Sequence, residues 1–347
     1  MDNIILTSLL QDYSRKRQKA IEELNIRRNE IYSKNSKLGL IEDEINKTAI
    51  ESSKSVLISD KTKQIKIIKE LNTKMKKLRD ERKSLLKTLG KDESYLTPVY
   101  ECITCKDTGY FTDKHFNTIM CNCLKQAIFN VTYNKSNMSN LQKENFDTFN
   151  FKLYSNSPDN VKFKTTISPR DNIETIVDIS KSFINNFDNP EEKNLFFVGN
   201  SGLGKTFLCN CIANEILKKE KTVLYQTASN LLDTIIDYKF GKHDISKEIY
   251  DNIYNVDLLI IDDLGTESIN GYKISELFNL LNARLLNQNN KITKTIISTN
   301  LSLSDLFTTY EERIVSRIGG CYTICKFYGD DIRLRKSPKG TGTSGDF

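Results

Sequence analysis

Apolar residues in the first hundred positions recur at helical spacing. A first run has steps of three, four or seven and consists of Leu10, Tyr13, Ala20, Leu24 and Ile31. A second run follows a heptad and consists of Ile68, Leu71, Met75, Leu78, Leu85 and Leu89. Arg82 is the one polar position in that heptad, Gly39 separates the runs, and Gly90 follows the second. The pattern predicts a helical hairpin or short coiled coil over residues 1–98, with two or more helices.

The pattern changes at about residue 166, where short apolar runs begin to alternate with helical segments. Strands are expected over 195–198, 222–225, 257–261, 295–298 and 322–327. Helices are expected over 168–187, from 205 onward, and over 230–238, 272–287 and 303–317. Strands that alternate with helices are typical of βαβ units. We therefore predict an α/β domain with a mainly parallel sheet over residues 166–335.

Three further segments complete the expected domain organisation. Pro98 marks a boundary, and residues 99–130 form a small unit with four cysteines. Residues 131–165 are rich in Asn, Ser and Lys, with scattered aromatic residues, and are expected to be a linker that packs on the next domain. Residues 336–347 are expected to be a disordered tail.

The net charge of +6 is concentrated in the predicted arm. Residues 1–100 hold 22 Lys and Arg against 15 Asp and Glu, which is +7 and leaves −1 for the rest. Such an arm can bind nucleic acid or an acidic protein, or can be a solvated lysine-rich helix. The sequence shows neither an apolar stretch of membrane-spanning length nor a signal peptide, so a cytoplasmic protein is expected.

A phosphate-binding loop is the strongest chemical motif. The sequence G-x4-G-K-T follows an apolar strand and precedes a helix, and it comprises Gly199, Asn200, Ser201, Gly202, Leu203, Gly204, Lys205 and Thr206, with Phe207 next. Such a loop turns its backbone amides toward phosphates. Lys205 is expected to contact the β- and γ-phosphates, and the Thr206 hydroxyl to bind Mg²⁺. The sequence thus predicts an ATP site.

Two later strands end in polar residues of the kind that such a site needs. Asp262 and Asp263 follow a buried apolar strand. We assign Asp262 to Mg²⁺, mostly through bound water, and Asp263 to the attacking water. Asn300 ends the next strand, where its amide can hold that water or simply form a turn.

Arginines lie beyond these strands. Arg313 and Arg317 are four residues apart and share a helix face, and Arg333 follows near the end of the chain. They can contact the γ-phosphate, in the same chain or from a neighbour, or can form surface ion pairs with Glu311, Glu312 and Asp331.

Four cysteines in a 22-residue window have the spacing of a metal site. Cys102 and Cys105 are separated by two residues, and Cys121 and Cys123 by one. Two close pairs can converge on one tetrahedral Zn²⁺ with no open position, so the site is expected to be structural. An iron–sulfur cluster and unliganded thiols remain alternatives, and His115 can replace one sulfur. The other cysteines (Cys209, Cys211, Cys321 and Cys325) are expected in the core.

Together, these motifs resemble the AAA+ ATPases and, among them, the bacterial replicative-helicase loaders of the DnaC/DnaI type. The resemblance rests on LFFVGNSGLGKT, LLIIDDLG, TIISTN, RIVSRI and DDIR, and the arm with CxxCxDTGY and CxC extends it loosely upstream. It implies Walker A, Walker B and sensor 1 roles for Lys205 with Thr206, for Asp262 with Asp263, and for Asn300. It further implies that Arg317 is an arginine finger acting in trans and Arg333 a sensor 2 arginine.

The resemblance also implies a function. An ATPase with ATP, Mg²⁺ and Zn²⁺ would bind the replicative DNA helicase and single-stranded DNA, associate with itself, and release the helicase on hydrolysis. The arm would then be a surface for the helicase, and DNA contacts would lie on the ATPase domain. Asp263 stands where many AAA+ proteins have Glu, which suggests slow, switch-like hydrolysis. Two alternatives remain: a transposition helper ATPase of the IstB type, and a nucleotide-switched scaffold with negligible hydrolysis.

Overall fold

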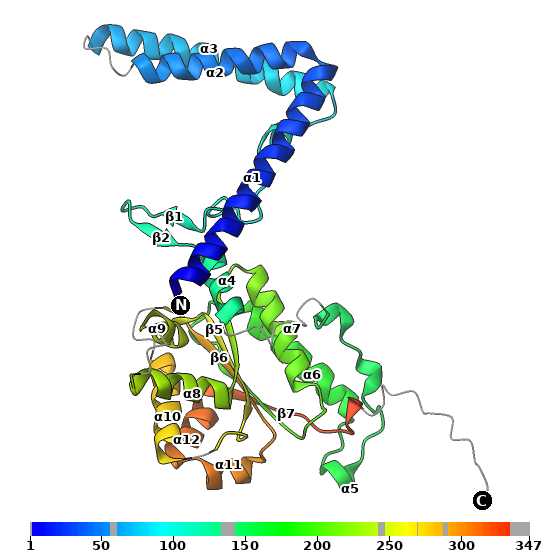
Figure 1. Ribbon diagram of the computed structural model, residues 1–347. Helices are drawn as coiled ribbons and strands as arrows, with labels where there is room; N and C mark the ends of the chain where they lie inside the picture. The colour runs from blue at the N-terminus through cyan, green and yellow to red at the C-terminus, as the bar shows by residue number, and fades with distance from the viewer. Residues whose placement is uncertain are drawn as a thin grey trace, which may run out of the picture. The chain divides into compact units, whose positions relative to one another are not determined.

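The computed structural model describes residues 2–55, 61–132, 143–241, 247–268, 270–286 and 291–333 (Figure 1). The chain divides into two compact units, one of residues 10–119 and the other of residues 1–9 with 120–347. The predicted tail at 336–347 and part of the predicted linker lie outside the described residues. Within the described ranges, no helix has the length and apolar character needed to cross a membrane.

Three long helices make up most of the first unit: α1 (Asp2–Lys34), α2 (Ser36–Ser55) and α3 (Lys61–Thr88). The short 3-10 helix η1 (Glu93–Leu96) and the two-stranded sheet of β1 (Tyr110–Thr112) and β2 (Thr118–Met120) follow. Helices α2 and α3 lie side by side as a hairpin (Figure 1). The helical arm predicted from the apolar pattern is confirmed, with three helices.

The break between the first two helices differs from the prediction. It falls at Asn35, and Gly39 lies inside α2. Asparagine is favoured at helix ends because its side chain competes for backbone hydrogen bonds. A glycine inside a helix costs only about 1 kcal/mol, which tertiary packing can offset.

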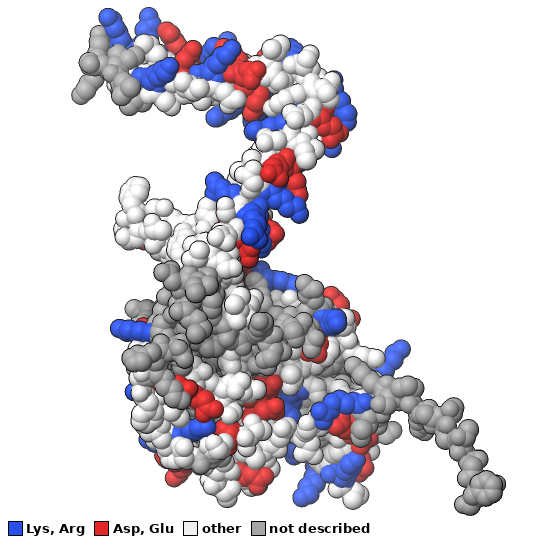
Figure 2. Space-filling view, viewed as in Figure 1, with Lys and Arg blue, Asp and Glu red and all other residues white. Residues whose placement is uncertain are grey.

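Ion pairs connect the two helices of the hairpin, and each helix contributes both basic and acidic residues to them. Arg82, the polar position of the heptad, pairs with Glu42 at 3.1 Å, and Lys37 pairs with Glu81 at 2.7 Å. Figure 2 shows Lys and Arg interleaved with Asp and Glu along this part of the chain, on the face in view. The arm therefore presents a mixed surface there, although its net charge is positive.

The second unit is built on a five-stranded parallel sheet. Its strands are β3 (Asn194–Val198), β4 (Val223–Thr227), β5 (Leu258–Leu264), β6 (Lys294–Thr299) and β7 (Tyr322–Lys326), in the order β4-β5-β6-β3-β7. All four strand pairs are parallel. This confirms the α/β fold class and all five predicted strands, whose ends differ by a few residues.

Helices cover both faces of the sheet. One face packs on α6 (Pro169–Asn185) and α7 (Lys205–Lys218). The other packs on α8 (Ala228–Lys239), α9 (Lys247–Asn255), α10 (Gly271–Leu285), α11 (Leu303–Thr309) and α12 (Glu312–Cys321). Cys209, Cys211 and Cys325 are buried in the core, as predicted, whereas Cys321 is only partly buried. The helix predicted over 303–317 is in fact two, separated at the buried Tyr310.

Short elements precede the sheet: α4 (Asn122–Thr132), η2 (Phe146–Thr148), η3 (Phe151–Leu153) and α5 (Asn160–Phe163). The sequence pattern did not predict α4 or α9. Helix α4 closes the free edge of β4, because the Gln126 amide exchanges two hydrogen bonds with the Val223 backbone, at 3.0 and 2.7 Å. Phe129 from the same helix is buried in the core.

Candidate nucleotide-binding site and four-cysteine cluster

The phosphate loop joins the end of β3 to the start of α7. Gly199, Gly202 and Gly204 have φ values of 153°, 77° and 90°. A Cβ atom on Gly202 would lie 2.1 Å from the Asp331 carboxylate, and one on Gly199 would lie 2.3 Å from the Phe327 carbonyl oxygen. Glycine is needed at these positions both for the left-handed backbone and for the close approach of the C-terminal segment.

Lys205 is held by three acceptors. Its Nζ donates to the carbonyl oxygens of Gly199 and Asn200, at 2.6 and 2.8 Å, and to Oδ1 of Asn300, at 2.7 Å. The side chain is buried, which lowers the pKa of Lys205, while the carboxylates of Asp263 and Asp262 raise it. The structure therefore brings the loop lysine and the strand-end amide together, as the motif spacing predicts.

Asp262 is surrounded by hydroxyl donors. Its Oδ2 accepts from the hydroxyl of Tyr225, at 2.7 Å, and from that of Thr206, at 3.2 Å. Its Oδ1 accepts from the Ser298 hydroxyl. A carboxylate beside a threonine hydroxyl is the all-oxygen donor set that Mg²⁺ prefers. The residues present thus fit the predicted magnesium site.

Asp263 lies next to Asn300 because β5 is irregular at this point. The pairing of β5 with β6 shifts register between Ile261 and Leu264, and Asp263 has a left-handed φ of 55°. The Asn300 side-chain amide donates to Oδ1 of Asp263, at 3.3 Å. Burial, and secondly the charge of Asp262, raise the pKa of Asp263. A raised pKa makes a carboxylate a stronger base once it is ionised.

An aromatic pocket adjoins the loop, and sequence reasoning missed it as part of the site. Phe149, Tyr154, Phe207 and Ile332 are among its lining residues, together with Gly204 of the loop. The Tyr154 hydroxyl donates to the carbonyl oxygen of Leu203 at 3.0 Å. The walls of the pocket are mostly apolar and aromatic, and its volume of about 30 Å³ is far below that of a typical ligand pocket. The only sequence signal was the run of aromatic residues in the predicted linker.

The three arginines have different surroundings. Arg333 donates to the Ser201 hydroxyl at 3.1 Å and pairs with Asp331 at 2.8 Å, so it contacts the phosphate loop. Arg313 pairs with Glu311 at 2.5 Å. Arg317 is exposed on α12 and donates to Oδ1 of Asn282, at 3.3 Å. Of the described contacts of Arg317, none joins it to the phosphate loop.

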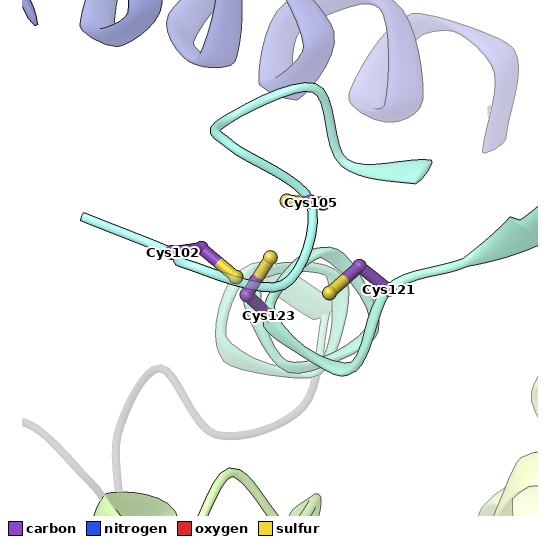
Figure 3. A group of neighbouring side chains, drawn as sticks. All are labelled: Cys102, Cys105, Cys121 and Cys123. Atoms are coloured by element: carbon purple, nitrogen blue, oxygen red, sulfur yellow. The ribbon is translucent and has the colours of Figure 1, made fainter. Parts of the chain in front are cut away.

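The four cysteines of the predicted metal site come together. Their sulfur atoms all lie within 4.8 Å of one another and point toward a common centre (Figure 3). Tetrahedral zinc with bonds of ~2.3 Å separates its sulfurs by about 3.8 Å, so the group fits the ion. His115 is exposed and does not belong to this group.

Asp107 shapes the turn that carries the first cysteine pair, and sequence reasoning missed it. Its buried carboxylate accepts from the backbone amides of Glu101, at 3.0 Å, and Cys102, at 2.8 Å. The Gly109 amide donates to Sγ of Cys105, at 3.4 Å. Amide donors toward sulfur stabilise a thiolate, which is the form that binds a metal.

Comparison with known proteins relates the α/β part of the chain to replication ATPases. Residues 160–324 match the family model of the bacterial DnaA ATPase domain. The chromosomal replication initiator protein DnaA of Streptococcus agalactiae serotype Ia is 35% identical over 128 residues, covering 35% of this chain and 26% of that protein. The chain therefore spans about a quarter of the length of this relative.

Solved structures are also similar to about half of the chain, and two of them are a helicase loader and a DnaA. The crystal structure of the DnaC helicase loader has 24% sequence identity and a TM-score of 0.42, over 55% of this chain and 99% of that chain. AMPPCP-bound DnaA from Aquifex aeolicus has 23% identity and a TM-score of 0.40, over 46% of this chain and 48% of that chain.

The matched range contains most of the site described above. It includes the phosphate loop, both aspartates at the end of β5, Asn300 and Arg317, whereas Arg333 lies beyond it. The family model, the parallel sheet and the geometry of the phosphate loop all indicate the same kind of nucleotide-binding domain. They support an ATP-binding ATPase domain over residues 160–324 that is similar to the ATPase domain of bacterial DnaA.

Proposed function

We propose that this protein is an ATP-dependent loader that binds the replicative DNA helicase and helps to place it on single-stranded DNA. The observation that carries the proposal is one chain that joins an AAA+ ATPase domain to a helical arm and a four-cysteine cluster. The motifs that resemble those of the DnaC/DnaI loaders support it. ATP binding and hydrolysis would control assembly with the helicase and release from it.

In the proposed mechanism, Lys205 contacts the β- and γ-phosphates. Thr206 and Asp262 would hold Mg²⁺, which neutralises charge on the phosphates when bound. Asp263, with its raised pKa, accepts a proton from the attacking water, and Asn300 orients that water. Arg333 of the same chain and Arg317 of a neighbour contact the γ-phosphate.

The four-cysteine cluster has a structural part in this proposal. Four thiolates would fill the coordination of Zn²⁺, so no position is left for a substrate. The cluster would order a short segment that has few buried apolar residues of its own. The arm and this segment would together contact the helicase.

Exposed aromatic rings support the single-stranded DNA contact. Phe240 and Tyr272 have ring centroids 5.4 Å apart and are 70% and 42% exposed. Exposed rings of this kind stack on nucleic-acid bases without regard to sequence. These rings support a DNA contact on the ATPase domain in preference to one on the arm.

Size-exclusion chromatography of the protein with its host's replicative helicase tests the proposal. We expect the protein and the helicase to elute together when ATP is present. We also expect their complex to retain a fluorescent single-stranded oligonucleotide. The Lys205→Ala variant should lose the ATP dependence of both results, because it lacks the phosphate contact. Separate elution of protein and helicase under all nucleotide conditions would contradict the loader function.

The same preparation separates the two alternatives. Capture of a transposase in place of the helicase would favour a transposition helper. A second outcome is that, with helicase and DNA present, the unmodified protein releases phosphate no faster than the Lys205→Ala variant does. That result would favour a scaffold that ATP binding switches without significant hydrolysis.

A further inference from the structure

Tyr225 is a buried tyrosine that no motif of the sequence singles out. It lies on β4, where it pairs with Ile260 of β5, two residues before Asp262. Residues two apart on a strand point to the same side of the sheet, so Ile260 and Asp262 share a face. The Tyr225 side chain lies in the core on that face and is long enough to reach Asp262.

The Tyr225 hydroxyl ends at the predicted magnesium ligand. It donates to Oδ2 of Asp262 at 2.7 Å, the same oxygen that accepts from Thr206. Tyr225 is only 1% exposed, so its hydroxyl lies inside the protein beside the carboxylate to which it donates.

A carboxylate that ligates a metal needs a fixed orientation. Asp262 is itself buried, and its two oxygens are held from opposite strands, by Tyr225 of β4 and Ser298 of β6. Outer hydrogen-bond partners of this kind typically change metal affinity by about 10- to 100-fold when they are removed. Ser298 also accepts a hydrogen bond from the backbone amide of Asp263, so its removal would disturb two residues of the site. Tyr225 belongs to none of the sequence motifs, and its hydroxyl donates to Asp262.

We propose that Tyr225 is a positioning residue for nucleotide-bound Mg²⁺, which acts by holding the Asp262 carboxylate toward Thr206. The inference rests on the proposed ATP chemistry of this site. It assigns to β4 a part in metal binding that no motif in the sequence of this strand indicates.

The Tyr225→Phe variant tests the inference, because it removes the hydroxyl alone. A fluorescent ATP analogue is titrated with Mg²⁺ in the full-length protein, and the half-saturating Mg²⁺ concentration is measured. We expect that concentration to rise about 10-fold, while binding of the analogue in EDTA stays within twofold. A merely structural role would weaken binding equally in EDTA and in Mg²⁺.

Tyr322→Phe is the matched control. Tyr322 is also a buried tyrosine of the sheet, but it pairs with Asn194 at the amino end of β3, the end of the sheet away from the site. Its half-saturating Mg²⁺ concentration should equal that of the unmodified protein. A Tyr225→Phe value within twofold of the control would overturn the inference. Failure of the unmodified protein to bind the analogue would instead count against the proposed function.

Discussion

Asp263 is the residue on which the proposed hydrolysis step depends most. Its raised pKa, its left-handed backbone and its contact with Asn300 occur together at the bulge in β5. A non-glycine residue in this conformation costs about 1–2 kcal/mol, which neighbouring interactions must offset. Such strain commonly marks a functional position.

Asp263→Asn should abolish the base and leave the contacts of Lys205 in place. We expect phosphate release to fall at least about 100-fold, because positioned acid–base groups contribute that much or more. Binding of a fluorescent ATP analogue should stay within about threefold, since the variant removes no phosphate contact of the loop. Both are measured on the same preparation.

Asp251→Asn, an exposed position on α9, is the control and should match the unmodified protein. Undiminished phosphate release in Asp263→Asn would exclude Asp263 as the base. It would leave the orientation of the water to Asn300 and the backbone.

The residues that the sequence could predict are those that the chemistry fixes by type and spacing. Lys205 and Asn300 lie together as expected, since the ends of parallel strands meet at one edge of the sheet. Tyr225, Ser298 and Asp107 could not be found in this way. Each contacts a partner that strand register or a turn brings close. The order of residues alone does not predict the register of the strands or the shape of the turn.

At the scale of elements, the apolar pattern predicted the helices and strands that are held by many packed side chains. It missed features that depend on one or two contacts. The five strands and the arm were predicted because their apolar positions repeat. Helix α4 was missed although its contacts with the sheet domain include the hydrogen bonds of Gln126 and the buried ring of Phe129. Individual contacts of this kind leave no repeating pattern in the sequence. The split at Tyr310 was missed because one buried tyrosine, bonded to Glu267, interrupts an otherwise helical pattern.

The four-cysteine element is expected to depend on its metal. We predict about one zinc per chain by elemental analysis, and no iron or acid-labile sulfide. Removal of zinc with a chelator should speed amide hydrogen exchange over residues 102–123, because few apolar side chains hold that segment. Exchange in β6, the central strand of the ATPase sheet, should not change.

Cys105→Ser should lose the zinc, since it removes one of four converging sulfurs. Cys321→Ser is the control, because that cysteine lies at the end of α12 and outside the cluster. Zinc retained in Cys105→Ser, or a zinc-free protein with unchanged exchange, would exclude a structural zinc site.

At the scale of the whole molecule, the net charge of +6 does not by itself indicate that the arm binds nucleic acid. Lysines and arginines of the arm are interleaved with acidic residues, and several are engaged in ion pairs (Figure 2). A mixed surface of this kind favours a specific protein partner over the phosphate backbone of DNA. The arm therefore agrees with a helicase contact better than with a DNA contact.

Self-association is the remaining proposal at the scale of the whole molecule, and Arg317 makes it testable. Its side chain is exposed and contacts Asn282, and none of its described contacts joins it to the phosphate loop of its own chain. We therefore expect it to act on a nucleotide that a neighbour binds. Arg317→Ala should bind ATP normally and hydrolyse it about 1000-fold more slowly, the usual effect of losing an arginine finger.

Mixing two inactive variants distinguishes action in trans from action in cis. Lys205→Ala lacks a working site but keeps Arg317, and Arg317→Ala keeps the site but lacks the arginine. Each should be inactive alone, and their mixture should recover part of the phosphate release, because a neighbour can supply the missing guanidinium. Arg313→Ala is the control, since Arg313 is paired with Glu311 and lies over the ring of Phe278. A mixture as inactive as its components would mean that Arg317 does not reach a neighbour's nucleotide, and that ATP turnover needs no assembly of this chain with itself.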